Sequence, residues 1–143
     1  MLTTHADSTA PADLLWTRVA DVESWPEHLE TFTSVRHVGG PAPAGVGSRF
    51  EVRQPGLPTS VYEVTEWTAG TSFTWAARSR AVTGTAIHTV VPTDAGSRLD
   101  LGLTWTGPLA GLLRLLIGRK AQRMIELEAS TFASLAAADA TRG

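Results

Sequence analysis

The feature that most constrains the fold is a long helical pattern at the end of the chain, after a region that alternates like β-strands. Residues 107–135 carry apolar side chains at helical spacing, and a helix of this length spans roughly 43 Å at about 1.5 Å per residue. Such a helix buries its apolar face most simply across a curved antiparallel sheet. A sheet that grips a helix tends to leave an apolar hollow between the two, and small molecules bind in such hollows.

The middle of the chain predicts the strands of that sheet. Apolar and polar side chains alternate at 48–54, 72–79 and 98–106, and further strands are expected at 2–7, 33–38, 60–67 and 85–91. Short turns and one loop rich in glycine and proline, at 39–45, separate them. One apolar face per strand indicates an antiparallel sheet with one face in water.

Helices are expected on either side of this region. A first short helix begins at Pro11 and runs to about residue 22, and a second opens at Pro26. The tail beyond Ala136 is expected to fray. The long helix is expected to pack its apolar residues on the sheet, namely Leu109, Leu112, Leu113, Leu116, Ile117, Met124, Leu127, Phe132 and Leu135.

Composition excludes several classes of function. The 143 residues fit one domain. A net charge of −2 lacks the excess of positive charge that is typical of nucleic-acid-binding proteins. The absence of cysteine excludes a disulfide framework, a thiol nucleophile and a thiolate zinc site. The four histidines are far apart in sequence, the glycines fit no nucleotide-binding pattern and no GxSxG motif occurs, so we expect no metal, no cofactor and no covalent intermediate.

The chain also lacks the apolar runs of a membrane span or a signal peptide. Its longest apolar run, at 109–117, is interrupted by Arg114 and is far shorter than the ~20 residues a span needs. The polar first ten residues are unlike a signal peptide. We therefore expect a cytoplasmic protein, either a monomer or a homodimer.

The order of elements, together with several stretches of sequence, resembles a known superfamily. The stretches are "APADLLWTRVADVESWPEH" (10–28), "GVGSRFEVRQPGLPTSVYEVTEW" (45–67), "FTW" (73–75), the strand with His88, and "GPLAGLLRLLIG" followed by "ELEA" (107–129). They resemble the START-like, Bet v 1-like superfamily (SRPBCC), in its bacterial polyketide cyclase/dehydrase branch, over nearly the whole chain. The resemblance implies an α+β helix-grip fold: a seven-stranded curved antiparallel sheet around a long C-terminal helix, with two short helices after the first strand.

Two departures from the family pattern are visible. The first strand is short and polar, and His28 stands where relatives often have a second tryptophan. The rim of the implied cavity is therefore more polar and more titratable than the family pattern suggests.

The alternation along the strands, together with the apolar residues of the helices, nominates the residues that line this cavity. For most of them plain core packing is the simpler interpretation, but a thin helix on a broad sheet cannot absorb every aromatic ring, which favours the cavity for Trp75 and Trp105. The nominated lining is Trp25, Phe50, Val52, Tyr62, Val64, Phe73, Trp75, Leu99, Leu101, Leu103, Trp105, Leu113, Ile117 and Met124.

Three titratable side chains are candidates for catalysis. His88 shares its strand parity with apolar neighbours, so we expect it to point inward, where a histidine can exchange a proton near neutral pH. Tyr62 is the only tyrosine, and its hydroxyl can donate to a developing enolate. His28 is placed at the entrance. A structural role is the alternative interpretation for His88 and Tyr62, and a solvated surface position is the alternative for His28.

Other charged and polar residues receive plainer interpretations. Gln54 and Glu66 lie at strand ends and are expected near the mouth of the cavity. The long helix carries Arg119, Arg123, Glu126 and Glu128, which we interpret as a charged face turned to solvent or to a partner.

The sequence is compatible with three functions of this fold. The first is a cavity that binds a small hydrophobic, polyketide-like molecule and promotes its cyclisation or dehydration by acid–base chemistry. The second is a carrier or sensor of a lipid or isoprenoid, which needs the same cavity but no titratable group inside it. The third is an interaction domain with a filled cavity and a functional outer surface.

Overall fold

The predicted strands form one antiparallel sheet in the computed structural model, which describes residues 1–39 and 43–142. In this described part the sheet has seven strands in the order β1-β7-β6-β5-β4-β3-β2, and every neighbouring pair is antiparallel. Residues 40–42 of the predicted loop at 39–45 lie outside the described residues. The strands are β1 (Leu2–Ser8), β2 (Ser34–Val38), β3 (Arg49–Arg53), β4 (Ser60–Thr68), β5 (Ser72–Arg78), β6 (Thr83–Thr93) and β7 (Gly96–Thr106).

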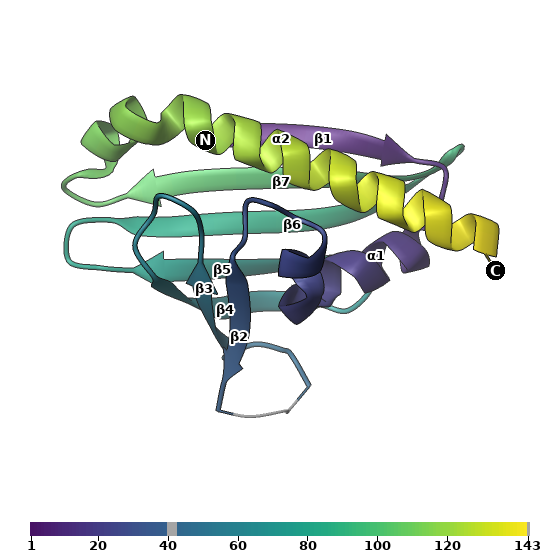
Figure 1. The fold of residues 1–143 in the computed structure, drawn as a ribbon, viewed down its shortest axis with the longest axis horizontal. Coiled ribbons are helices and arrows are strands. Elements are labelled where there is room, and N and C mark those ends of the chain that lie inside the picture. The colour runs from purple at the N-terminus through teal and green to yellow at the C-terminus, as the bar shows by residue number, and fades with distance from the viewer. Residues whose placement is uncertain (40–42, 143) are drawn as a thin grey trace.

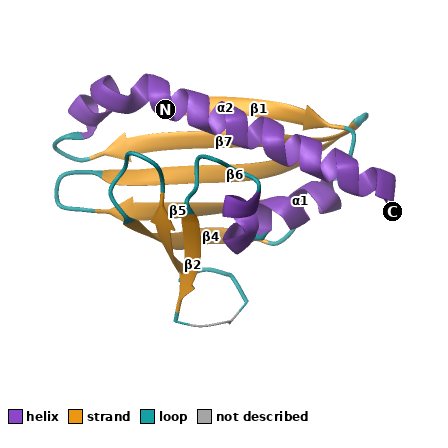
Figure 2. Cartoon of the chain, viewed as in Figure 1, coloured by secondary structure: helices purple, strands orange, loops and turns teal. Residues whose placement is uncertain are grey.

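The helices all lie on one face of this sheet. Helix α2 (Ala110–Arg142) crosses the sheet along β1 and β7, and its C-terminal half packs on the short helix α1 (Ala12–Ala20) (Figure 1). A 3₁₀ helix, η1 (Val22–Glu27), follows α1 and contacts β2. Figure 2 shows the same two layers, with strands on one side and helices on the other. The helix-grip fold expected from the sequence is confirmed.

Two strands differ in detail from the prediction. Strand β6 continues through Pro92, where we expected it to stop. Val90 donates its N–H to the carbonyl of Thr71, the residue just before β5 begins. The nitrogen of Pro92, two residues on, therefore faces a side where β5 offers no acceptor. Strand β4 carries a register shift between Val64 and Glu66, which turns Glu66 to solvent instead of toward the predicted mouth.

The second short helix also differs. It begins at Val22 and has Pro26 near its end, whereas we expected it to open at Pro26. The Ser24 N–H donates to the Asp21 carbonyl at 3.0 Å, so the tighter 3₁₀ turn starts as soon as α1 stops.

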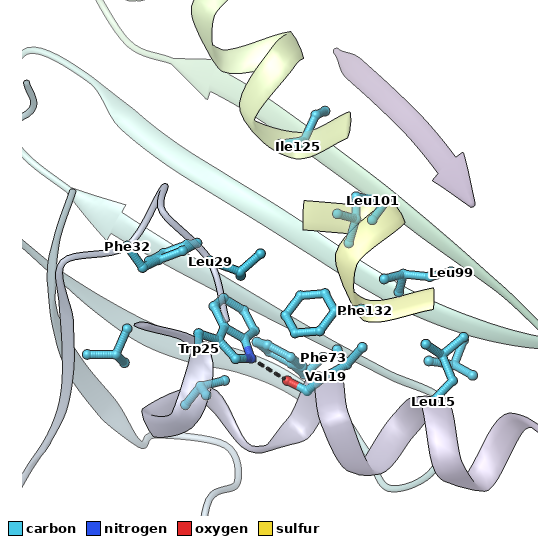
Figure 3. Packing of buried hydrophobic residues seen from close by; sticks show 14 of the residues in the cluster. Leu15, Val19, Trp25, Leu29, Phe32, Phe73, Leu99, Leu101, Ile125 and Phe132 are labelled. Atoms are coloured by element: carbon cyan, nitrogen blue, oxygen red, sulfur yellow. Dashed lines mark hydrogen bonds between the residues drawn. The ribbon is translucent and has the colours of Figure 1, made fainter. Parts of the chain in front are cut away.

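The core is centred on Trp25, which η1 inserts between the sheet and α2. Its side chain is 1 % exposed, and its indole N–H donates to the Val19 carbonyl at 3.1 Å, as the dashed line in Figure 3 shows. The ring lies 5.1 Å from the ring of Phe32 and 5.3 Å from that of Phe132, centroid to centroid. A buried tryptophan with its single donor satisfied anchors the helices to the sheet.

The C-terminal tail does not fray, contrary to our expectation. Helix α2 continues to Arg142, and Ala136 is fully buried. The guanidinium of Arg18 on α1 donates to both carboxylate oxygens of Asp139, at 2.7 and 2.8 Å. A bidentate pair of this kind fixes the last turns of α2 to α1.

The prediction that the leucines of residues 109–135 pack inward is wrong for four of them. The residues that α2 buries follow a single stripe with a spacing of three or four residues, because only one side of a helix can face a sheet. Leucines off that stripe stay in solvent. The exposed ones are Leu109, Leu112, Leu116 and Leu127, together with Leu115.

Candidate functional site

A cavity lies between the sheet and the first half of α2. Its walls come from the middle of β4 to β7, from α2, and from the segments around η1 and the β3–β4 turn. It offers about 110 Å³ to the centres of water-sized molecules, whereas one water needs about 10–15 Å³ on this measure. The space is therefore large enough for a small organic molecule.

The cavity walls are mainly aromatic and aliphatic. Trp25, Tyr62 and Trp75 form a continuous aromatic wall, in which Trp75 lies 5.3 Å from Trp25 and 4.9 Å from Tyr62, centroid to centroid. Leu101, Leu103 and Trp105 of β7, together with Ile117 and Met124 of α2, complete the apolar lining.

Glu128 is the one carboxylate in the described lining. Glu128 is 8 % exposed, and its carboxyl group makes no hydrogen bond of good geometry to a described residue. Burial raises its pKa to about 8, and the nearby Thr31 hydroxyl opposes this shift only in part, because it does not reach hydrogen-bond geometry. At neutral pH Glu128 is therefore mostly a neutral acid with a proton to donate.

His88 lies on the floor of the same cavity in a defined tautomer. Its Nδ1 is 3.2 Å from the Phe73 carbonyl oxygen, which can only accept, so Nδ1 carries the proton and Nε2 keeps a free lone pair. The ring stacks on Phe73 at 4.2 Å. Burial lowers the pKa of His88 to about 4, so the ring is neutral at physiological pH and can accept a hydrogen bond.

Tyr62 supplies a third polar group. Its hydroxyl makes no hydrogen bond to a described side chain or backbone group, and its ring is one wall of the cavity. Burial, with a smaller contribution from the negative charge of Glu128, raises the pKa of Tyr62. The phenol therefore stays protonated and can donate.

The β3–β4 turn closes one side of the cavity against α2. Gln54 and Leu57 contribute from the turn, and Lys120 reaches across from α2 to donate to the Pro55 carbonyl at 3.3 Å. The amide of Gln54 is held by the Thr31 carbonyl at 3.1 Å. Lys120 is the one lysine or arginine among the described lining residues.

The structure brings together most of the residues nominated from the sequence. Nine of them line the cavity: Trp25, Tyr62, Trp75, His88, Leu101, Leu103, Trp105, Ile117 and Met124. Their functional roles remain predictions.

The other nominated residues lie elsewhere. Phe50, Val52, Val64, Phe73 and Leu99 share the predicted inward parity but are packed solidly in the core. The cavity occupies only part of that face, because Trp25 and Phe132 fill the rest. Leu113 is half-buried outside the cavity. His28 is exposed and lies 3.2 Å from an Arg18 nitrogen, outside the cavity lining.

Sequence reasoning missed the polar residue that most marks this site. We expected Glu128 on a solvated face, but it follows Ile125 by three residues and precedes Phe132 by four, which places it on the inward stripe. The same spacing would have identified Ala121. Phe32, Leu57 and Ile125 were also not nominated.

Within the described residues, no three histidine, aspartate or glutamate side chains gather to hold a metal ion. Tyr62, His88 and Glu128 are the titratable groups of the cavity wall that the proposed chemistry uses.

Known structures share this fold. The chain resembles the protein TTHA0849 from Thermus thermophilus with a TM-score of 0.73 and 20% identity, covering 96% of this chain and 97% of that one. The Helicobacter pylori protein jhp0584 gives a TM-score of 0.80 at 10% identity, covering 94% and 86%. The di-domain ARO/CYC StfQ from the steffimycin biosynthetic pathway gives 0.66 at 17% identity, and there the match covers 98% of this chain and 50% of StfQ.

These likenesses concern the fold, since each is below a quarter identity. A search of curated proteins finds no match. The model of the family described as polyketide cyclase / dehydrase and lipid transport matches residues 2–137. The cavity under a long helix and the match over almost the whole chain lead to one conclusion: this chain belongs to the polyketide cyclase / dehydrase and lipid transport family.

Proposed function

We propose that the chain binds a small hydrophobic molecule with one hydrogen-bonding end, and that it acts on this molecule by acid–base chemistry. The observation that carries the proposal is the buried carboxyl group of Glu128, which faces an apolar cavity and makes no hydrogen bond of good geometry to a described residue. A buried polar group left unpaired costs about 1–3 kcal/mol. A ligand hydroxyl or carbonyl at this position would recover that free energy.

The polar groups of the cavity suit such a ligand end. Glu128 and Tyr62 can both donate a proton to a ligand oxygen, and Nε2 of His88 can accept one. The remaining walls are apolar and aromatic and would hold the carbon skeleton of the ligand.

The reaction this set fits best is loss of water from a β-hydroxy carbonyl compound. Nε2 of His88 would take the proton next to the carbonyl, whose oxygen Tyr62 would stabilise by donation. Glu128 would give its proton to the leaving hydroxyl, which departs as water while the carbon–carbon double bond forms. Proton transfer from His88 back to Glu128 would restore both groups. Intramolecular attack on the same activated carbonyl would give cyclisation.

A carrier or sensor of a lipid or isoprenoid is the alternative. It is favoured by the low pKa of His88, which makes this ring a weak base. Mass spectrometry of compounds that co-purify with the native protein distinguishes the two functions. A bound compound that stays unchanged on incubation favours the carrier, and conversion to a product lighter by one water supports the enzyme.

Ligand recognition by Glu128 can be tested with 2-naphthol and naphthalene, which differ by one hydroxyl group. We expect 2-naphthol to bind the wild type on the order of tenfold more tightly than the Glu128→Leu variant, since one hydrogen bond contributes about 1 kcal/mol or more. Naphthalene should bind both proteins similarly. Equal binding of 2-naphthol to both would remove Glu128 from the recognition of the ligand.

A further inference from the structure

The first half of α2 carries leucines in solvent that neither the core nor the cavity uses. Leu112 is 51 % exposed, Leu115 is 82 % exposed and Leu116 is 70 % exposed. Figure 1 shows this half of the helix on the outside of the molecule, away from α1. A cluster of large apolar side chains in water marks a surface that binds something.

The same stretch holds four of the twelve basic residues of the chain. Residues 107–125 contain Arg114, Arg119, Lys120 and Arg123 and no aspartate or glutamate, although the whole chain has a net charge of −2. None of these four cations is in a salt bridge with a described residue. The charge therefore remains available to an anionic partner.

The helix spacing places leucine and arginine side by side. Leu112, Leu116, Arg119 and Arg123 follow each other at intervals of four, three and four residues, which puts them on one side of α2. The cavity residues Ile117, Ala121, Met124 and Glu128 repeat the same intervals on a different side. One helix thus has a cavity row and an outer leucine–arginine row.

We propose that the outer row docks the protein on an anionic lipid surface. A helix face with leucines and basic residues binds at the boundary between lipid head groups and acyl chains, where the leucines enter the apolar layer and the cations meet the head groups. The binding is peripheral, since none of the described helices is long and apolar enough to cross a membrane.

A second copy of the chain fits this face less well. Two such faces would bring four arginine side chains together, Arg119 and Arg123 of each copy, and like charges at an interface oppose association. An anionic surface removes that repulsion. Docking here would also place the cavity about one helix diameter, roughly 10–12 Å, from the lipid, which suits a ligand with low solubility in water.

Co-sedimentation with vesicles tests the proposal without any cavity ligand, so its outcome is independent of the proposed function. The vesicles contain either phosphatidylcholine alone or equal parts of phosphatidylcholine and phosphatidylglycerol. The wild type should sediment with the anionic vesicles, less so at high salt, and not with the neutral ones. Arg119→Gln with Arg123→Gln should weaken binding on the order of 25-fold, from roughly fivefold for each basic residue near an anionic surface.

The leucines are tested by a second pair, Leu112→Gln with Leu116→Gln, which should weaken binding by roughly tenfold or more. Matched controls are Val61→Gln, an exposed apolar residue of β4, and Arg49→Gln, an exposed arginine of β3. Both controls should bind like the wild type, and circular dichroism verifies the fold of each variant. If one double variant fails to fold, the other double variant and the salt dependence of the wild type still test the proposal.

Three results would overturn the proposal. One is wild-type protein that fails to sediment with anionic vesicles at low salt. Another is equal sedimentation with neutral vesicles. The third is a wild-type dimer in sedimentation velocity that Leu112→Gln with Leu116→Gln converts to a monomer while no vesicle binding occurs, because that would assign the face to a second copy.

Discussion

Replacing Glu128 by glutamine should make the protein more stable at alkaline pH and should remove one component of its pH dependence. In the folded protein the carboxyl group has a pKa of about 8, raised from an ordinary value of 4.5 by burial. Between these two values the folded chain holds a proton that the unfolded chain releases, so raising the pH favours unfolding. Glutamine has nearly the same shape and carries no charge at any of these pH values.

The size of the effect follows from the shift in pKa. One pH unit corresponds to about 1.36 kcal/mol, so a shift of roughly three and a half units corresponds to about 5 kcal/mol once the pH is above 8. Because pH 7 lies roughly two and a half units above the ordinary pKa, the destabilisation at pH 7 is about 3 kcal/mol. The free energy of unfolding of the wild type, relative to Glu128→Gln, should therefore fall by about 1.4 kcal/mol per unit from about pH 4.5 to 8 and then level off.

Urea unfolding followed by tryptophan fluorescence, at one-unit steps from pH 4 to 9, measures this difference. Other titrating groups, His88 included, contribute to both proteins and cancel in the comparison. Glu126→Gln is the matched control, since Glu126 is an exposed residue of the same helix, and it should show no such slope. A difference between wild type and Glu128→Gln that stays constant across this pH range would mean that Glu128 is ionised and hydrated in the folded protein.

Three further predictions concern the core, the tail and His88. Phe132→Ala removes a buried ring from the core beside Trp25 and should lower the free energy of unfolding by about 3–5 kcal/mol in urea titrations; a loss below 1 kcal/mol would contradict this packing. Asp139→Asn breaks the bidentate pair with Arg18 and should cost about 1 kcal/mol and speed amide exchange in the last turns of α2, whereas unchanged exchange would indicate a tail held by other contacts. By nitrogen-15 NMR, His88 should titrate near pH 4 as the Nδ1–H tautomer, and the stability it contributes should be lost as the pH falls from about 6.5 toward 4; a midpoint near 6.5 would refute its burial.

The sheet was predictable because alternation along a strand is a local property. Phe50, Val52 and Trp75 were assigned to the inner face from parity alone, and all three are buried there. The prediction was less accurate where the pairing between neighbouring strands determines the structure. The register shift near Thr65 depends on how β4 pairs with β5. Strand β6 passes Pro92 because β5 begins only at Ser72, opposite Thr89, and does not extend beside Pro92.

The cavity was predictable as a class of site but not in its extent. Parity says which side chains face the helix, but it does not say where the helices fill that space, so Phe50 and Val64 were nominated although they are core residues. Leucines were assigned inward by residue type, and Glu128 was assigned outward for the same reason. The spacing of three and four residues along α2 gives the correct side for Glu128, Leu112 and Leu116, and it is the better guide on a helix this long.

The measurement that tests the ligand-binding cavity most directly is calorimetric titration of 2-naphthol into the wild type and into Ala121→Phe. Ala121 lines the cavity, so phenylalanine at this position would fill the space, whereas Ser130→Phe places the same ring on the exposed side of α2 as a control. We predict saturable binding to the wild type and to Ser130→Phe, and binding weakened by roughly tenfold or more in Ala121→Phe. No binding to the wild type, or equal binding to all three proteins, would contradict a functional cavity between the sheet and α2.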